Sequence, residues 1–354
     1  MGTVRLSVCI PIYNFGAFVA ATLESIVRQV TEEVEVVILD GGSTDNTAEV
    51  VEGYRWRFPR FRYERQEKRG GIDRDMAKAV ALATGEYCWV FSGDDLMREG
   101  SVARVLSAIQ HGGCDVYLLE SMLCRFDMTP VALHRLLRSA KPRTFRLHER
   151  RERSEYFRLA NNTAAFFSFC SAVVVKRSRW NSVTVDESFY GTCWAHAARI
   201  FGMLESGLVV RYLPGAFLDK RGDNDSFLTN GPTRRFAIAV DGYNKIADEF
   251  FGYDSAEAFH IRRAVRGELP LTQWLLARLD VAAHSRAGDP ELFDRLVRTT
   301  FCDPSVRNWI TLVLARSTPL WMLKLAQRAL RAWRGARATR ERPRAPCVDS
   351  STRR

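Results

Sequence analysis

The sequence predicts an α/β fold, in which a mostly parallel sheet is flanked by helices and followed by a helical C-terminal extension. Apolar runs of strand length alternate with helical patterns over residues 4–215, which is the order of elements in a doubly wound sheet. Polar, glycine-rich turns follow several of these strands, and ligands bind at the carboxyl ends of strands in such sheets. After Pro232 the strand patterns cease and the chain is expected to be helical.

The first half of the chain carries the most regular elements. Val4–Ile12 is an apolar run in which Pro11 is expected to end the hydrogen bonding, because proline has no N–H to donate. Gly85 is the expected C-cap of an alanine-rich helix. In chain order we expect strands at 4–12, 35–39, 61–65, 86–91 and 116–121, and helices at 17–30, 48–54, 76–83 and 101–110.

The second half is less regular. Basic residues accumulate over 126–153 while the periodicity weakens, which indicates an excursion or a lid. Beyond it we expect a strand within 164–175, a loop at 187–193, a helix at 194–205, a strand at 208–213 and a polar loop at 219–227. The chain is accordingly divided into a sheet domain at 1–218, a helical region at 219–317 and a basic segment at 318–354.

Charge is unevenly spread along the chain. The composition is that of an ordinary globular protein, with 46% hydrophobic and 26% charged residues, but the net charge is +11 and the part from Arg316 on is dense in arginine. Such a segment favours an anionic surface, either a membrane or nucleic acid. The sequence shows no zinc-finger spacing and no RNA-binding aromatic signature, so we expect no nucleic-acid partner.

Cysteine usage and the N-terminus indicate a cytoplasmic protein. The eight cysteines form no CxxC pair, and Cys9, Cys88 and Cys170 lie in apolar runs typical of buried thiols in a reducing compartment. Met1 is followed directly by a strand pattern, with no signal-peptide pattern before it. No apolar run approaches the ~18 residues that a membrane span needs.

Residues 318–334 mix leucine and tryptophan with lysine and arginine at helical spacing. A helix of this kind lies in a membrane interface, with its apolar face down and its basic residues at anionic headgroups. The alternative is a terminal helix that packs on the preceding domain and keeps its basic face in water. We expect the remaining tail, rich in arginine, proline and serine, to be disordered.

Asp94 and Asp95 follow the aromatic strand 86–91 through Ser92 and Gly93. Adjacent carboxylates repel each other unless a positive charge lies beside them. Mg²⁺ or Mn²⁺ meets this need, because such ions take one or two carboxylates and complete their coordination with water and substrate phosphates. The alternative is an acidic turn that caps the next helix.

Three motifs at successive strand ends resemble the family 2 glycosyltransferases of the GT-A fold. They are the Pro-Ile-Tyr-Asn turn at 11–14, Asp-Gly-Gly-Ser-Thr-Asp at 40–45 and Ser-Gly-Asp-Asp at 92–95, and the resemblance covers residues 4–215. The variant forms Arg-Gly-Gly-Ile-Asp-Arg-Asp at 69–75, Gly-Thr-Cys-Trp-Ala-His at 191–196 and Arg-Gly-Asp-Asn-Asp-Ser at 221–226 look like the abequosyltransferase-like branch. Enzymes of that branch add sugars to lipid-linked O-antigen or related surface glycans.

The resemblance implies roles for individual residues. Asp95 would hold the metal that bridges the donor diphosphate, and Asp94 would contact the ribose. Asp223 would be a further metal or phosphate contact, or part of an exposed Asp-Asn turn. Arg69 and Arg221 would add positive charge near the diphosphate, or be solvated surface arginines. The expected walls and contacts of the nucleotide are Pro11, Tyr13, Asp40 and Asp73.

The general base is the point at which this chain departs from the family pattern. Many members carry Glu-Asp near the start of the helix after the acceptor loop, whereas this chain has Thr192-Cys193 there. His196, just beyond, can accept a proton at neutral pH, and Asp186 is the rival candidate. The alternatives are a helical histidine bonded to a neighbour and a loop acid that caps a turn.

The resemblance implies an inverting, metal-assisted transfer of a sugar from a nucleotide-diphosphate donor to a hydroxyl of a lipid-linked surface glycan. A catalytically weakened nucleotide-sugar-binding or scaffold protein is the alternative, favoured by the missing Glu-Asp and opposed by intact Asp40, Asp94 and Asp95. A nucleotidyltransferase would need a basic phosphate loop near the N-terminus, which residues 11–16 do not provide. The expected place of action is the cytoplasm or the inner face of the membrane.

Overall fold

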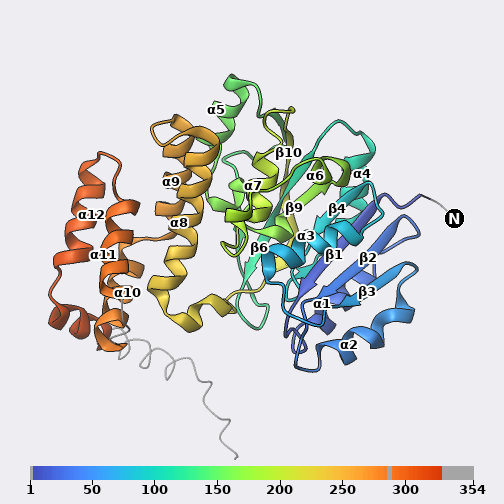
Figure 1. Ribbon diagram of the computed structural model, residues 1–354, viewed down its shortest axis with the longest axis horizontal. Helices are drawn as coiled ribbons and strands as arrows, with labels where there is room; N and C mark the ends of the chain where they lie inside the picture. The colour runs from blue at the N-terminus through green and yellow to red at the C-terminus, as the bar shows by residue number, and fades with distance from the viewer. Residues whose placement is uncertain (1–2, 285–288, 329–354) are drawn as a thin grey trace, which may run out of the picture. The chain divides into compact units, whose positions relative to one another are not determined.

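A computed structural model describes residues 3–284 and 289–328. The chain divides into two compact units, Met1–Leu269 and Pro270–Arg354, and each is described by itself. The first unit contains a sheet of ten strands in which β9 and β5 run antiparallel to their neighbours and β1, β2, β3 and β4 are mutually parallel (Figure 1). The order along the sheet is β3-β2-β1-β4-β9-β6-β10-β5, with β7 paired to β6 and β8 paired to β10.

The strands are β1 (Leu6–Ile12), β2 (Val34–Asp40), β3 (Phe61–Arg65), β4 (Tyr87–Val90), β5 (Leu96–Met97), β6 (Val116–Cys124), β7 (Pro130–His134), β8 (Arg143–Arg146), β9 (Val173–Lys176) and β10 (Val209–Lys220). The helices of this unit are α1 (Val19–Val27), α2 (Thr47–Tyr54), α3 (Ile72–Leu82), α4 (Ser101–Gln110), α5 (Arg150–Leu159), α6 (Arg177–Asn181), α7 (Ala195–Phe201), α8 (Pro232–Phe251) and α9 (Ala256–Glu268). The predicted α/β fold class is confirmed.

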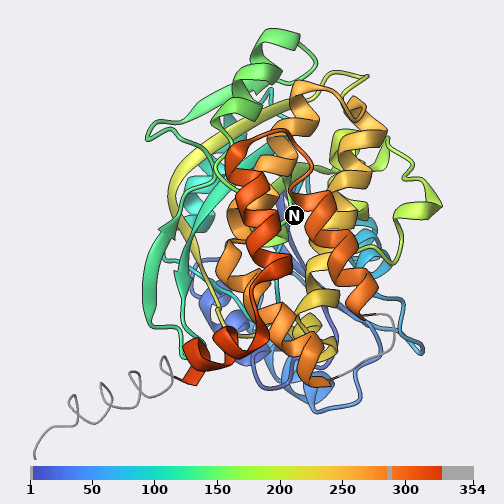
Figure 2. The same ribbon diagram turned by 90° about the vertical axis from the view of Figure 1, so that its left-hand side faces the viewer.

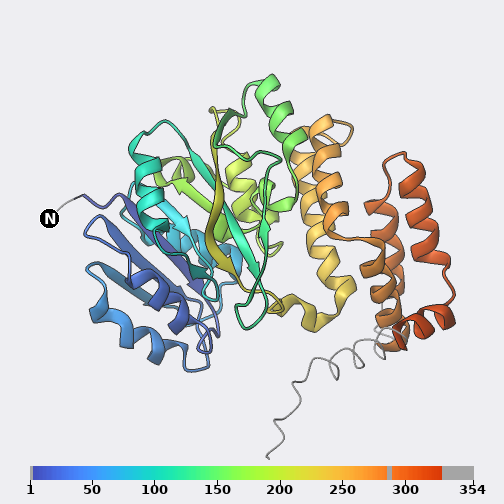
Figure 3. The same ribbon diagram turned by 180° about the vertical axis from the view of Figure 1, so that it is seen from behind.

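Helices cover both faces of the sheet. Alternate residues of β1, among them Val8 and Ile10, pack with α1, α2 and α4 in one apolar core. Figure 3 shows these three helices in front of the strands. The other residues of β1, including Cys9, are equally buried, and α3 lies against β1 and β2 on that side. Burial on both faces accounts for the continuous apolar runs that the sequence shows.

Three sequence-based expectations need correction. β1 keeps its register with β2 past Pro11 as far as Ile12, so proline does not end the strand. β10 extends to Lys220 instead of stopping at 213, because register shifts after Leu213 accommodate Pro214 and Gly215 within the strand. The segment 126–153 is not wholly irregular, because β7, β8 and the start of α5 lie within it.

The second unit is helical. α10 (Leu271–His284), α11 (Asp289–Thr300) and α12 (Val306–Ser317) pack on one another (Figure 2). Residues 320–328 are also helical; the rest of the predicted helix 318–334 and the basic tail lie outside the described residues. Among the helices of 3–284 and 289–328, none is long and apolar enough to cross a membrane.

Candidate active site

Three loops that the sequence singles out meet at one edge of the sheet. Ile12, the last residue of β1, is in register with Asp40 at the end of β2, while Cys9 is in register with Val90 at the end of β4. The turn after β4 passes so close to the first strand that a Cβ on Gly93 would lie 2.6 Å from the Ile12 side chain. Glycine at this position therefore permits the close approach that brings the acidic turn to the loop after β1.

The two carboxylates of this turn are held by neighbouring elements. Asp95 is buried; its Oδ2 accepts a hydrogen bond from Ser171 Oγ at 2.7 Å, and its Oδ1 accepts one from the Arg221 backbone N–H at 3.0 Å. Asp94 Oδ2 accepts from Asn224 Nδ2 at 2.7 Å. Burial, and then the charge of Asp94, raise the pKa of Asp95 to about 7. The pair therefore lacks a full balance of positive charge.

This donor set fits a hard divalent cation. Two carboxylates, one of them buried and raised in pKa by the other, are the ligands that Mg²⁺ or Mn²⁺ takes when substrate phosphates complete its coordination. Residues 3–284 and 289–328 contain no group of three or more His, Cys, Asp or Glu side chains that could hold a metal ion. Asp223 is exposed and does not add a third carboxylate; its neighbour Asn224 contacts Asp94 instead. The expectation of a metal contact at Asp223 is corrected accordingly.

Arg221 belongs to the site and is not a solvated surface arginine. Its Nε donates to the Asp94 carbonyl at 3.0 Å, and a terminal nitrogen donates to the Phe126 carbonyl. The guanidinium also lies 5.1 Å from the Phe18 ring centroid and 5.8 Å from that of Phe126. Arg221 thus ties the turn between β6 and β7 to the acidic turn after β4.

Lys220, the last residue of β10, is a cation that the sequence reading did not select. Its ammonium lies 4.3 Å from the Phe169 ring centroid. Its charge opposes the rise in the pKa of Asp95 and adds to burial in lowering the pKa of His134 to about 4. The adjacent Lys220 and Arg221 at the end of β10 were the available signal for a cationic site. The strand expected at 208–213 stops short of them.

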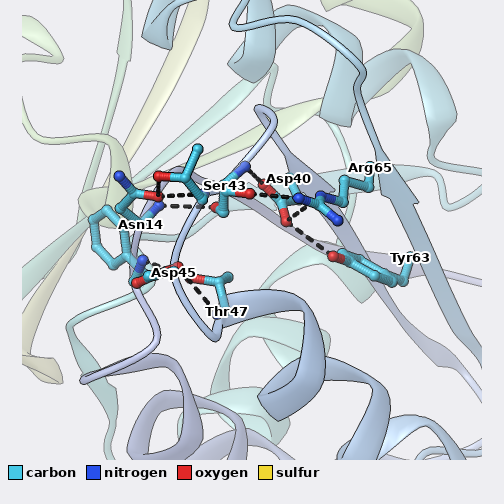
Figure 4. Close-up of polar contacts among 9 residues, drawn as sticks. Asn14, Asp40, Ser43, Asp45, Thr47, Tyr63 and Arg65 are labelled. Atoms are coloured by element: carbon cyan, nitrogen blue, oxygen red, sulfur yellow. Dashed lines mark hydrogen bonds and ion pairs between the residues drawn. The ribbon is translucent and has the colours of Figure 1, made fainter.

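The other end of the site centres on Asp40, which is fully buried (Figure 4). Asp40 Oδ1 accepts the Ser43 backbone N–H at 2.7 Å, and Oδ2 accepts the Tyr63 hydroxyl at 2.9 Å. Arg65 Nε lies 3.8 Å from the same oxygen, with half of its side chain exposed. Tyr63 and Arg65 come from β3 and were not selected from the sequence, since only pairing of β3 beside β2 brings them here.

The loops after β1 and β2 are joined by reciprocal hydrogen bonds, also drawn in Figure 4. Asn14 N–H donates to Ser43 Oγ at 2.8 Å, while Asn14 Oδ1 accepts the Thr44 N–H at 2.8 Å. Asp45 accepts the Gly16 N–H at 3.0 Å, and Phe15 N–H donates to Thr47 Oγ1 at 2.8 Å. These contacts hold the loops after β1 and β2 together at the polar edge of the sheet.

Of the remaining residues expected to contact a nucleotide, two lie together. The Arg69 guanidinium lies 4.2 Å from the ring centroid of the half-buried Tyr13, which places a cation and an aromatic face at the same loop. Pro11 is buried inside β1. Its contribution to the wall of a nucleotide site stays a prediction, as does that of Tyr13.

Asp73 holds the loop before α7. Its Oδ2 accepts the backbone N–H groups of Gly191 at 2.8 Å and Cys193 at 2.9 Å, and its Oδ1 accepts that of Ala195 at 3.1 Å. Gly191 has φ +87° and Cys193, a non-glycine residue, has φ +73°. Such a backbone needs support from outside the loop, and the Asp73 carboxylate provides it.

We expect Asp73→Ala to lower the free energy of unfolding by about 2 kcal/mol or more, because three backbone donors lose their acceptor. Chemical denaturation monitored by circular dichroism measures the change. Glu187→Ala is the control, since it removes an exposed carboxylate of the same region that pairs with Arg74, and exposed pairs contribute under about 1 kcal/mol. Equal losses of stability in Asp73→Ala and Glu187→Ala would contradict the supporting role of the Asp73 carboxylate.

His196 lies on α7 and is buried. Its Nε2 is 2.8 Å from the Phe167 carbonyl oxygen, so Nε2 carries the proton and Nδ1 keeps its lone pair. Among the described residues, Nδ1 has no hydrogen-bond partner. Burial lowers the pKa of His196, and the charge of Asp73 opposes that shift. The side chain is therefore a neutral imidazole at pH 7, and its unpartnered acceptor nitrogen is itself buried.

Asp186, the rival for the base, has a local role. It is exposed, and its Oδ1 accepts the Ser188 N–H at 2.8 Å as the N-cap of the short helix 187–189. Hydrogen bonds from Ser188 lower the pKa of Asp186. This geometry is that of an acid capping a turn, the alternative that the sequence left open.

The comparisons with known proteins agree with these motifs. Residues 7–178 match the model of glycosyl transferase family 2. The chain is 27% identical over 311 residues to abequosyltransferase RfbV of Salmonella typhimurium strain LT2, an alignment that covers 86% of this chain and 92% of that protein. It is also 30% identical over 113 residues to glycosyltransferase GlyG of Streptococcus pneumoniae serotype 4, covering 32% and 38% of the two chains.

Solved structures support the same fold. S. aureus TarS 1–349 in complex with UDP-GlcNAc aligns over 93% of this chain and 92% of its own, with a TM-score of 0.57 and 15% identity. Mannosyltransferase PcManGT from Pyrobaculum calidifontis, in complex with GDP-Man and Mn²⁺, covers 91% and 88% with a TM-score of 0.52 and 17% identity. At such identities the likeness concerns the fold, which is GT-A.

Fold, strand-end motifs and family match define the class: the chain carries a family 2 glycosyltransferase domain with the GT-A fold. Within that family it is abequosyltransferase-like, as the variant motifs indicate and the alignment to RfbV over 86% of the chain confirms.

Proposed function

We propose that this protein transfers a sugar from a nucleotide-diphosphate donor to a hydroxyl of a lipid-linked surface glycan, with inversion at the anomeric carbon. The observation that carries the proposal is the Asp94–Asp95 pair at the end of β4, where a buried carboxylate with a pKa of about 7 lies beside a second one. Lipid-linked acceptors and inversion come from the resemblance to the abequosyltransferase branch. The polar edge around Asp40 and Tyr13 would bind the nucleotide.

The reaction is a direct displacement. The acceptor oxygen forms a bond to the anomeric carbon while the bond from that carbon to the diphosphate oxygen breaks, and the nucleoside diphosphate leaves with the electron pair. His196 Nδ1 would take the proton of the acceptor hydroxyl, since it is an unprotonated nitrogen without a partner among the described residues. Mg²⁺ or Mn²⁺, held by Asp95 and Asp94, would stabilise charge on the leaving diphosphate as a Lewis acid.

Charge on the leaving group would also be offset by side chains of the protein. Lys220, whose ammonium lies over the Phe169 ring, is close enough to affect the pKa of Asp95. Arg69, over Tyr13, would add charge at the nucleotide side. The proposed place of action is the cytoplasmic face of a membrane that carries the acceptor.

Selective donor binding tests this function. We expect one or two members of a panel of CDP-, UDP-, GDP- and dTDP-sugars with Mn²⁺ to raise the melting temperature, because a ligand that binds the folded state alone stabilises it by about 2.7 kcal/mol at one hundred times its Kd. The free nucleoside monophosphates, which lack the diphosphate, serve as the control. No shift with any donor would contradict the proposal.

The alternative of a nucleotide-sugar-binding or scaffold protein predicts the same shift without turnover. Slow hydrolysis of the selected donor in the absence of acceptor separates the two, since a binding protein releases no nucleoside diphosphate. We expect release above the rate of the uncatalysed reaction.

A further inference from the structure

α12 exposes its apolar side chains instead of burying them. Ala315 is the single buried residue of this helix. Five large apolar side chains share the opposite face, at the spacing i, i+3, i+4, i+7 and i+8 of one helical stripe. They are Val306 (77% exposed), Trp309 (64%), Ile310 (45%), Val313 (38%) and Leu314 (43%), and we call them the α12 face. The one fully buried side chain of the helix is thus the small Ala315, while most of its large apolar side chains face outward, the reverse of a helix that packs on a core.

The helical residues 320–328 continue this pattern. Leu323 is buried, whereas Trp321, Met322 and Leu325 are 64%, 46% and 55% exposed. Elsewhere in the described chain, exposed large apolar residues occur singly, as Trp56 does, or as the one adjacent pair Phe227 and Leu228. A concentration of eight within twenty residues is typical of a surface that contacts a partner or a membrane.

The charges around this surface identify the partner. No acidic residue occurs from Pro304 to Arg340. Arg307, Lys324 and Arg328 are exposed, while Arg316 pairs with Asp294 at 2.5 Å. A second copy of the chain would bring cations against cations on this surface, which is unfavourable. An anionic bilayer satisfies both features, because its acyl region takes the apolar stripe and its phosphates take the arginines and lysine.

We propose that the α12 face, continued by Trp321, Met322 and Leu325, is the surface by which this protein lies on an anionic membrane. Trp309 and Trp321 would lie at the headgroup level, where indole rings are favoured. The proposal extends the membrane segment expected at 318–334 to α12, and it rests on the proposed function in one respect, since a lipid-linked acceptor is what makes attachment useful.

Vesicle flotation tests the surface. The full-length protein is expected to float with vesicles of 30% phosphatidylglycerol in phosphatidylcholine, and not with phosphatidylcholine alone. Trp309→Ser combined with Val313→Ser should weaken binding at least 10-fold although the whole basic tail is retained. Trp56→Ser is the matched control, since it removes an even more exposed tryptophan (81%) from the other unit and should bind like the unchanged protein.

A second pair, Val306→Ser with Leu314→Ser, repeats the test if the first variant melts at a lower temperature. Unchanged flotation of both double variants would overturn the proposal. A concentration-dependent dimer would also overturn it, if both double variants dissociate the dimer and the dimer does not float with the vesicles. Donor-induced thermal shifts are measured on the same variants without vesicles. They should equal those of the unchanged protein, so failure of donor binding in every sample counts against the proposed function alone.

Discussion

Asp95→Asn is expected to abolish sugar transfer and, in metal-free buffer, to make the protein more stable. The loss follows from the removal of the negative charge that would hold the metal. The gain follows from the pKa of about 7: the folded state binds a proton that the unfolded state releases near the ordinary value of 3.8, so stability falls as pH rises between these values. At pH 8 the asparagine should raise the free energy of unfolding by on the order of 3 kcal/mol.

Asparagine fits the site, because Ser171 Oγ and the Arg221 N–H that face Asp95 can be satisfied by an amide. Asp223→Asn is the control: it changes a nearby exposed carboxylate and should leave both transfer and stability close to those of the unchanged protein. Urea unfolding in EDTA at pH 5 and pH 8, together with a transfer assay, measures the two effects. Full transfer by Asp95→Asn, or undiminished transfer in excess EDTA, would contradict the account of the acidic pair.

His196→Ala should lower turnover by roughly 10² or more while donor binding is retained, since loss of a general base commonly costs this much. Asp186→Ala should stay near the unchanged rate, because that carboxylate caps a turn. Because burial lowers the pKa of His196, the neutral imidazole persists below pH 6.5, and the acidic limb of the pH–rate profile should lie below that value. Single-turnover rates measure the chemical step, and donor-induced thermal shifts measure donor binding.

The reverse result would make Asp186, and not His196, the general base. If Asp186→Ala were inactive and His196→Ala nearly normal, the exposed loop acid would have to move onto the acceptor during the reaction. His196→Gln helps to separate catalysis from packing, because glutamine keeps a donor for the Phe167 carbonyl but cannot take up a proton at neutral pH. It should fold normally and turn over as slowly as the alanine variant.

Local patterns predicted the fold, and the acidic turn follows a buried strand as those patterns indicate. Strand runs that are buried on both faces keep an apolar sequence, and the Gly93 turn needs a glycine for its close approach to Ile12, so both leave a signature in the chain. The strand that ends at Lys220 was cut short because Pro214 and Gly215 are usual terminators, whereas register shifts with β6 accommodate them.

Residues that reach the site through pairing of distant segments could not be found in this way. Tyr63 reaches Asp40 only because β3 pairs with β2, and Ser171 reaches Asp95 across 76 positions. Asn224, and not Asp223, contacts Asp94. The conformation of this turn, in which Asp223 has φ +56°, determines which of the two side chains does so. Asp73 was expected near the nucleotide, yet the observed hydrogen bonds of its carboxylate go to the loop before α7.

The most direct test of the central claim is nucleoside diphosphate release from the donor selected in the thermal-shift panel. The unchanged protein with Mn²⁺ and a membrane extract containing lipid-linked glycan should release nucleoside diphosphate and transfer labelled sugar in equal amounts. Asp95→Asn, or the unchanged protein in EDTA, should do neither. Release without transfer to any extract would contradict a glycan acceptor, and release that is unaffected by Asp95→Asn would contradict a site built on the Asp94–Asp95 pair.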